Sequence, residues 1–260
     1  MLERSDLMKI LFIGDIYGRP GLEMISNYLT ELKNTYRPNI IIVNAENAAN
    51  GRGISLKIYK ELMSQGIHAI TMGNWVWGNR ELFEFIDDSN IVRPMNFRNA
   101  PGKGFITVNY NGQKLLVINA LGRTFMNPNI DDPFTGIDSI IQNEAADFIL
   151  VDMHAEATSE KVALGHYLDG RVDAVVGTHT HIPTADERVL PNGTLYITDV
   201  GMTGPLNGVI GVSKEIVLDR FLNGYSTPNE VAPGAKQLNA VILDLVKKTI
   251  QRIHIESETV

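Results

Sequence analysis

Polar side chains that can bind metal ions recur along the chain, each after a run of apolar residues. They are Asp15, Glu46, Asn47, Asn74, His154, His179 and His181. Carboxylate, amide and imidazole groups suit a pair of divalent ions such as manganese, iron or zinc, and one carboxylate can bridge such a pair. The sequence therefore predicts a site for two divalent metal ions.

Each of these residues, taken singly, also has an ordinary structural explanation. An aspartate after a first strand is commonly a turn residue or a helix cap, and Glu46 or Asn47 could cap the next helix. His179 and His181 share a face on extended backbone whether or not they bind metal. The agreement among several strand ends favours the metal site, because ligands of open α/β sheets bind outside the carboxyl ends of the strands.

The other three histidines do not follow this pattern. His68 lies within an apolar run, His166 lies near the end of a predicted helix, and His254 is close to the C-terminus. We expect all three to be structural or surface residues.

The apolar runs that precede the polar residues predict buried parallel strands over residues 9–14, 39–47 and 68–74. Between the first two runs, apolar residues recur at helical spacing from Leu22 to Leu32. Ser55 is a plausible N-cap for a second helix that ends near Gly66. The first seventy residues therefore predict a βαβαβ unit with a parallel sheet.

The middle of the chain has a different pattern. Asn111-Gly112 stands between two apolar-rich runs, which is a strong hairpin signal because both residues tolerate positive φ. The pattern predicts a second sheet that is at least partly antiparallel. Further strands are predicted over residues 147–154, 173–179, 193–201, 240–246 and 250–256.

Length and composition set the broad class. A chain of 260 residues with 44% hydrophobic residues can bury one large core, so we expect a single domain over residues 8–260. Residues 1–7 fit no periodic element and are interpreted as a disordered leader or tag. The chain has no cysteine, which excludes disulfides and thiolate ligands.

The net charge and the hydropathy of the chain argue against some classes of binding partner. A net charge of −7 argues against binding of duplex nucleic acid, and a small anionic substrate would need local compensation such as metal ions. No run of some eighteen apolar residues occurs, so we expect no membrane partner and a cytoplasmic location. The sequence is compatible with a homo-oligomer and does not determine the oligomeric state.

Other glycine-rich or nucleophile motifs fail on spacing. Glycines 14, 18 and 21 do not form G-x-G-x-x-G, and the chain contains neither G-x-x-x-x-G-K-[ST] nor G-x-S-x-G. A nucleotide-binding Rossmann domain is therefore a less favoured alternative, and no motif supports a hydrolase with a serine nucleophile.

Several segments together resemble the YmdB-like branch of the calcineurin-like metallophosphoesterases, over residues 8–255. They are ILFIGDIYGRPG, NAENAANGRG, AITMGN, VRPMNF, INALGRTF, ATSEK, DGRVDAVVGTHTHIPTAD and LYITDVGMTGP. The resemblance implies a four-layer αββα sandwich, in which two sheets are covered by helices and two metal ions lie at the strand ends.

The resemblance also implies how the ligands are shared. Asp15, Asn47 and His181 match the ligands of one metal ion. Asn74, His154 and His179 match those of the other, and Glu46 would bridge the two. The broader superfamily has Asp-x-His after the first strand, whereas this chain has Asp15-Ile16-Tyr17, as is usual in this branch.

Trp75 departs from the family pattern. That pattern is Gly-Asn-His-x-Trp, so Gly73, Asn74 and Trp77 match, while Trp75 stands where the resemblance implies a catalytic histidine. The family histidine protonates the leaving oxygen, which an indole cannot do. General acid catalysis typically contributes roughly 10²- to 10⁴-fold. Trp75 either packs the rim of the cleft, which we favour, or stacks on a substrate base.

The function implied is a phosphodiesterase with two metal ions that hydrolyses 2′,3′-cyclic nucleotides or related phosphodiesters, with activity reduced by Trp75. One alternative is a metal-binding pseudoenzyme that acts as a nucleotide sensor or an interaction scaffold. Another is a phosphate monoesterase, which would prefer terminal phosphates. The sequence leaves the identity of the metal and the physiological substrate open.

Overall fold

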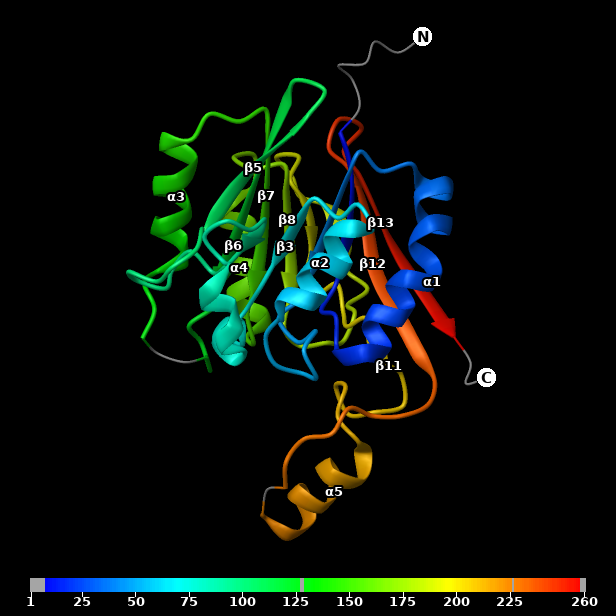
Figure 1. Cartoon of the computed structure of the whole chain (residues 1–260). Helices are drawn as coiled ribbons and strands as arrows, with labels where there is room; N and C mark the ends of the chain where they lie inside the picture. The colour runs from blue at the N-terminus through cyan, green and yellow to red at the C-terminus, as the bar shows by residue number, and fades with distance from the viewer. Residues whose placement is uncertain (1–7, 127–128, 226, 258–260) are drawn as a thin grey trace.

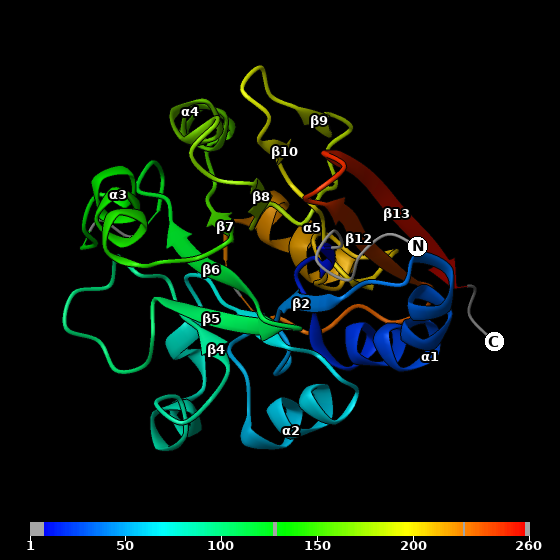
Figure 2. The ribbon, with the colours of Figure 1, turned by 90° about the horizontal axis from the view of Figure 1, so that it is seen from above.

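The computed structural model describes residues 8–126, 129–225 and 227–257. The predicted leader, residues 1–7, lies outside the described residues. Two β-sheets pack face to face, and helices cover the outer face of each sheet (Figure 1). Viewed from above, α1 and α2 lie on one side of the sheets and α3 and α4 on the other (Figure 2). The predicted αββα sandwich is confirmed.

The first sheet contains the predicted βαβαβ unit. Its strands are β1 (Lys9–Ile13), β2 (Ile40–Asn44), β3 (Ala69–Thr71), β4 (Ile91–Val92), β11 (Gly204–Pro205), β12 (Lys236–Asp244) and β13 (Thr249–Ser257). The first four run parallel, and β12 pairs antiparallel with β1. The connecting helices are α1 (Gly18–Tyr36) and α2 (Leu56–Ser64).

Local sequence explains both helices. The apolar residues of α1 that start with Leu22 face the sheet, and Arg37 ends the helix in a left-handed conformation just before Pro38. The Ser55 hydroxyl oxygen accepts a hydrogen bond from the Ile58 N–H, which caps α2 as predicted.

The second sheet combines parallel and antiparallel pairs. Its strands are β5 (Phe105–Tyr110), β6 (Gln113–Leu121), β7 (Phe148–His154), β8 (Ala174–Thr178), β9 (Arg188–Val189) and β10 (Leu195–Ile197). β5 and β6 form the predicted hairpin, in which Asn111 and Gly112 both have positive φ. The outer face carries α3 (Pro133–Asn143) and α4 (Thr158–Leu168).

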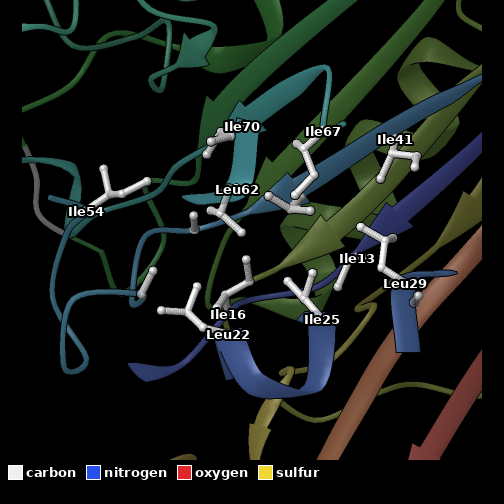
Figure 3. Close-up of a cluster of buried hydrophobic side chains, with 14 of the residues drawn as sticks. Ile13, Ile16, Leu22, Ile25, Leu29, Ile41, Ile54, Leu62, Ile67 and Ile70 are labelled. Carbon is white, nitrogen blue, oxygen red and sulfur yellow. The ribbon is translucent and has the colours of Figure 1, made fainter. Parts of the chain in front are cut away.

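Three buried apolar layers join the four layers of structure. Leu22, Ile25 and Leu29 of α1 pack against Ile13 and Ile41 of the first sheet (Figure 3). A second cluster fills the space between the two sheets, and a third lies under α3 and α4. Strands packed on both faces are held rigidly, so their carboxyl ends provide fixed attachment points for the loops that follow.

One segment departs from this layered plan. After β11 the chain leaves the first sheet, forms α5 (Lys214–Asn223) and returns as β12; α5 stands apart from the sheets in Figure 1. Two short 3-10 helices, η2 (Val76–Gly78) and η3 (Arg80–Glu84), follow β3. Within the described residues, no helix combines the length and the apolarity needed to cross a membrane.

Candidate metal centre

The structure brings all seven predicted ligand residues to one edge of the two sheets. Each residue either ends a strand or follows one within four residues: Asp15 after β1, Glu46 and Asn47 after β2, Asn74 after β3, His154 at the end of β7, and His179 and His181 after β8. The first sheet thus supplies the carboxylates and amides, and the second supplies the imidazoles. Their convergence follows from the parallel strands that precede them.

One group of ligand atoms gathers around His154. Its Nε2 lies 3.1 Å from Glu46 Oε1, 3.1 Å from Asn74 Oδ1 and 3.0 Å from His179 Nδ1. Ligand atoms that are each held about 2.0–2.2 Å from one ion lie roughly 3 Å from one another. The distances from His154 Nε2 therefore fit ligand atoms that share one ion.

A second group lies beside the first and shares Glu46 with it. The ligand atoms of Asp15, Glu46 and His181 lie within 4.8 Å of one another, and Asn47 Oδ1 lies 3.1 Å from His181 Nε2. Glu46 is the one residue that belongs to both groups of candidate ligands among the described residues. A carboxylate in this position can bridge two ions.

Burial provides an independent test of whether cations fit here. Asp15, Glu46 and His154 are almost completely buried. Asp15 Oδ1 finds no hydrogen-bond partner within the described part of the chain. Its nearest basic atom is His154 Nδ1, at 3.8 Å. A buried carboxylate oxygen without a hydrogen bond is costly, and a divalent cation would satisfy it. The residues therefore fit a pair of divalent ions.

The pKa shifts of the clustered residues also favour bound cations. Burial raises the pKa of Asp15 to about 7, although His154 and His181 oppose the shift. Burial alone would lower the pKa of His154, but the carboxylates of Glu46, Asp15 and Asp152 outweigh it and raise that pKa to about 9. Burial and the neighbouring His154 lower the pKa of His179 to about 3. The raised pKa of His154 reflects the acidic charge around it, which bound cations would offset in place of a proton on the ring.

Hydrogen bonds behind the cluster fix the histidine rings. His181 Nδ1 donates to the carbonyl oxygen of Ile210 at 2.9 Å, which leaves Nε2 as the lone-pair donor toward the cluster. Thr178 Oγ1 donates to Asp152 at 2.7 Å and lies 2.8 Å from His154 Nδ1. Because its proton goes to Asp152, the hydroxyl accepts from Nδ1, and the neutral ring presents Nε2 to the cluster.

Removal of the Thr178 hydroxyl should therefore weaken metal binding. Thr178→Val keeps the volume of this buried side chain but leaves His154 Nδ1 without its acceptor. We expect the affinity for Mn²⁺, measured by titration calorimetry, to fall about 10- to 100-fold, as is typical when such partners are lost. Thr135→Val, in the exposed first turn of α3 where the hydroxyl donates to the N-cap Asp132, is the matched control and should leave the affinity unchanged. Equal affinities for wild type and Thr178→Val would show that the hydroxyl does not orient His154.

A cavity of about 430 Å³ opens above the cluster. Its wall includes Glu46, His179 and His181 together with residues that the sequence did not single out: Tyr17, Arg52, Glu156, Ile210 and Asn229. Glu156 lies 2.9 Å from His179 Nε2, and Ile210 supplies the carbonyl described above. Glu156 and Tyr17 follow β7 and β1 within four residues, so the position after a strand could have pointed to them, whereas Arg52, Ile210 and Asn229 do not follow a strand in this way.

Trp75 lies on the wall of this cavity. Its side chain is partly exposed, at 37%, and the Arg52 guanidinium lies over the indole, 4.4 Å from the ring centroid. The backbone N–H of Trp75 donates to Glu46 Oε2 at 3.0 Å. Any residue except proline can make that backbone contact, so replacement of the indole changes the cavity wall and not the contact to Glu46. Trp77, by contrast, stacks on Phe83 and packs with Phe97.

The other three histidines lie outside both groups of candidate ligands in the part of the chain that the structure describes. His68 precedes β3 rather than lying inside it, and its Nδ1 accepts from the Ile41 N–H. His166 is exposed in the last turn of α4, and His254 contacts Asn239 and Glu256.

Comparison with known proteins gives the family. A model of the YmdB-like protein family matches residues 11–257. A protein of Bacillus subtilis (strain 168) named 2′,3′-cyclic-nucleotide 2′-phosphodiesterase is 51% identical over 253 residues, which cover 96% of each chain.

Two solved structures are also similar. A hypothetical protein from Thermus thermophilus has a TM-score of 0.92 and 42% identity, with 96% of this chain and 100% of that chain covered. A novel phosphatase from Mycoplasma pneumoniae has a TM-score of 0.91 and 38% identity, with 97% and 95% covered. The chain therefore belongs to the YmdB-like family of enzymes.

Proposed function

We propose that this protein is a metal-dependent phosphodiesterase that hydrolyses 2′,3′-cyclic nucleotides or related phosphodiesters. The observation that carries the proposal is the Glu46 carboxylate, which belongs to two adjacent groups of ligand atoms beneath an open cavity. The name of the Bacillus subtilis relative supports the substrate class.

The seven clustered residues would hold two divalent ions, with iron or manganese favoured and zinc as an alternative. Asp15, Asn47 and His181 would hold one ion, Asn74, His154 and His179 the other, and Glu46 would bridge them. When bound, the ions would neutralise the phosphodiester and activate the attacking water. The carboxylates and imidazoles hold this arrangement because strands packed on both faces fix their positions.

Arg52 would draw the anionic substrate into the cavity. It is the single lysine or arginine among the described residues that line the cavity, whose other charged residues are Glu46 and Glu156. The indole of Trp75 lies against the guanidinium and would restrict its motion. A guanidinium held in this way can pair with a phosphate oxygen.

Loss of this cation should weaken substrate binding and leave the metal site unaffected. We expect Arg52→Gln to raise KM for a 2′,3′-cyclic nucleotide about tenfold, as for a lost charge-assisted hydrogen bond, with unchanged metal content. Steady-state kinetics measures this, and Arg80→Gln, on the exposed side of η3, is the control. An unchanged KM in Arg52→Gln would remove Arg52 from substrate recognition.

Trp75 favours a second candidate function. A family enzyme whose general-acid position holds tryptophan can still bind metal ions and ligand, so a pseudoenzyme that senses a nucleotide or acts as an interaction scaffold retains the same site. Turnover with both ions bound supports the phosphodiesterase, whereas nucleotide binding without turnover supports the pseudoenzyme. Preference for terminal phosphates would instead indicate a monoesterase, in line with the name of the Mycoplasma pneumoniae phosphatase.

A further inference from the structure

A buried ion pair lies behind the loop that carries two of the candidate ligands. Lys161 Nζ of α4 lies 2.6 Å from Asp199 Oδ2, which follows β10, and both side chains are about 1% exposed. Lys161 is not among the described residues that line the cavity. Buried charges are costly, and a buried pair adds little net stability over apolar residues. The pair therefore calls for a role other than stabilisation of the fold.

Asp199 forms hydrogen bonds on both sides of the loop formed by residues 179–181, called the ligand loop here because it carries His179 and His181. Its Oδ2 accepts hydrogen bonds from the backbone N–H of Thr180 at 3.1 Å and from the Thr180 hydroxyl at 2.7 Å. Its Oδ1 accepts from the Gly201 N–H at 2.9 Å, and the next residue, Met202, donates its N–H to the His181 carbonyl oxygen. One carboxylate thus anchors the residue between the two histidines and the segment beside the second histidine.

The loop needs such an anchor because its backbone is strained. His179 has φ of 101° and His181 has φ of 68°, a region that side-chain-bearing residues rarely adopt. This conformation places Nδ1 of His179 and Nε2 of His181 in the two groups of candidate ligands. A strained loop of this kind persists only where its surroundings hold it in place.

We propose that the Lys161–Asp199 ion pair is a positioning device that holds the strained loop so that His179 and His181 face the metal ions. Lys161 pairs with Asp199 Oδ2, the oxygen that accepts from Thr180, and Asp199 transmits the restraint to both histidines. The inference rests on the proposed metal site. It assigns a task to Lys161 of the ATSEK segment, a residue that contacts neither the ions nor the cavity.

The test compares metal affinity with fold stability in matched variants of the full chain. Lys161→Met removes the cation and keeps most of the apolar stem, and we expect its Mn²⁺ affinity to fall about 10- to 100-fold. Asp199→Asn should show a similar loss, because an amide accepts more weakly and directs its NH₂ group at a backbone or hydroxyl donor. Leu164→Ala is the control, since Leu164 is buried in α4 within the outer apolar core.

Calorimetric titration with Mn²⁺ alone, well below the unfolding temperature of every variant, gives the affinities, and thermal melts of the metal-free proteins give the stabilities. Leu164→Ala should melt at a lower temperature yet bind Mn²⁺ within about twofold of wild type. The double variant Lys161→Met/Asp199→Asn has no unpaired buried charge, so it should melt above Lys161→Met. It should still bind Mn²⁺ at least about tenfold more weakly than wild type, which tests the proposal even if the single variant does not fold.

The outcomes separate this inference from the metal site itself. If wild type binds no Mn²⁺, the metal site and the inference both fail. If wild type binds Mn²⁺ and the double variant binds it equally well, only the inference fails. It also fails if Leu164→Ala loses as much affinity as Lys161→Met, because the loss would then reflect general loosening of the fold.

Discussion

Glu46→Ala is expected to remove almost all bound metal while the chain remains folded. The reason is that both groups of candidate ligands include the Glu46 carboxylate, so its loss removes a negatively charged ligand from each ion. The three apolar layers do not depend on this residue. Elemental analysis after dialysis should give about two ions per chain for wild type and close to none for the variant.

Two control variants sharpen this prediction. Glu84→Ala removes an exposed carboxylate on η3 and should retain both ions. Glu46→Gln keeps an oxygen ligand but not the bridging charge, so its metal content should fall between those of wild type and Glu46→Ala. Full metal content in Glu46→Ala would mean that this residue bridges nothing and that the ligand assignment is wrong.

The second large effect concerns Trp75. If position 75 is the general-acid position, tryptophan there leaves negative charge to build up on the leaving oxygen, and the rate should depend strongly on how stable that oxygen is as an anion. We expect measurable hydrolysis of a nitrophenyl phosphodiester and much slower hydrolysis of a 2′,3′-cyclic nucleotide. Trp75→His should raise kcat on the cyclic nucleotide by roughly 10²-fold or more. The gain on the nitrophenyl ester should be small.

Trp75→Phe separates proton donation from the removal of bulk. Phenylalanine opens space in the cavity but cannot donate a proton, so it should leave the slow rate on the cyclic nucleotide nearly unchanged. Metal content should be equal in the three proteins, because the contact to Glu46 comes from the backbone N–H. Brisk turnover of the cyclic nucleotide by wild type, with no gain in Trp75→His, would mean that another group donates the proton.

The layers of the fold were predictable because their signals are local. Apolar runs such as residues 39–47, the Ser55 cap and the Asn111-Gly112 turn each act through neighbouring residues. The three-residue strands β3 and β10 lie within the predicted runs 68–74 and 193–201, whereas the two-residue strands and the segment around α5 carried no such signal. The two-residue strands are too short to show a period, and α5 stands apart from the core whose burial imposes the apolar pattern of a helix.

The candidate ligands were predictable for a geometric reason, since parallel strands bring their carboxyl ends together. The cavity wall was not predictable, because Arg52 reaches the indole of Trp75 through a loop in which Asn50 and Gly51 have positive φ. Lys161 was missed because a lysine in a helix ordinarily faces solvent. Its burial depends on Asp199, which is 38 residues away.

Metal analysis of the purified protein, combined with an assay of nitrophenyl phosphodiester hydrolysis on the same sample, tests the central claim most directly. We expect about two divalent ions per chain, loss of hydrolysis after chelation, and recovery when Mn²⁺ is added. A protein that carries no metal under metal-replete conditions, or that hydrolyses the ester equally well after its metal is removed, would contradict the account.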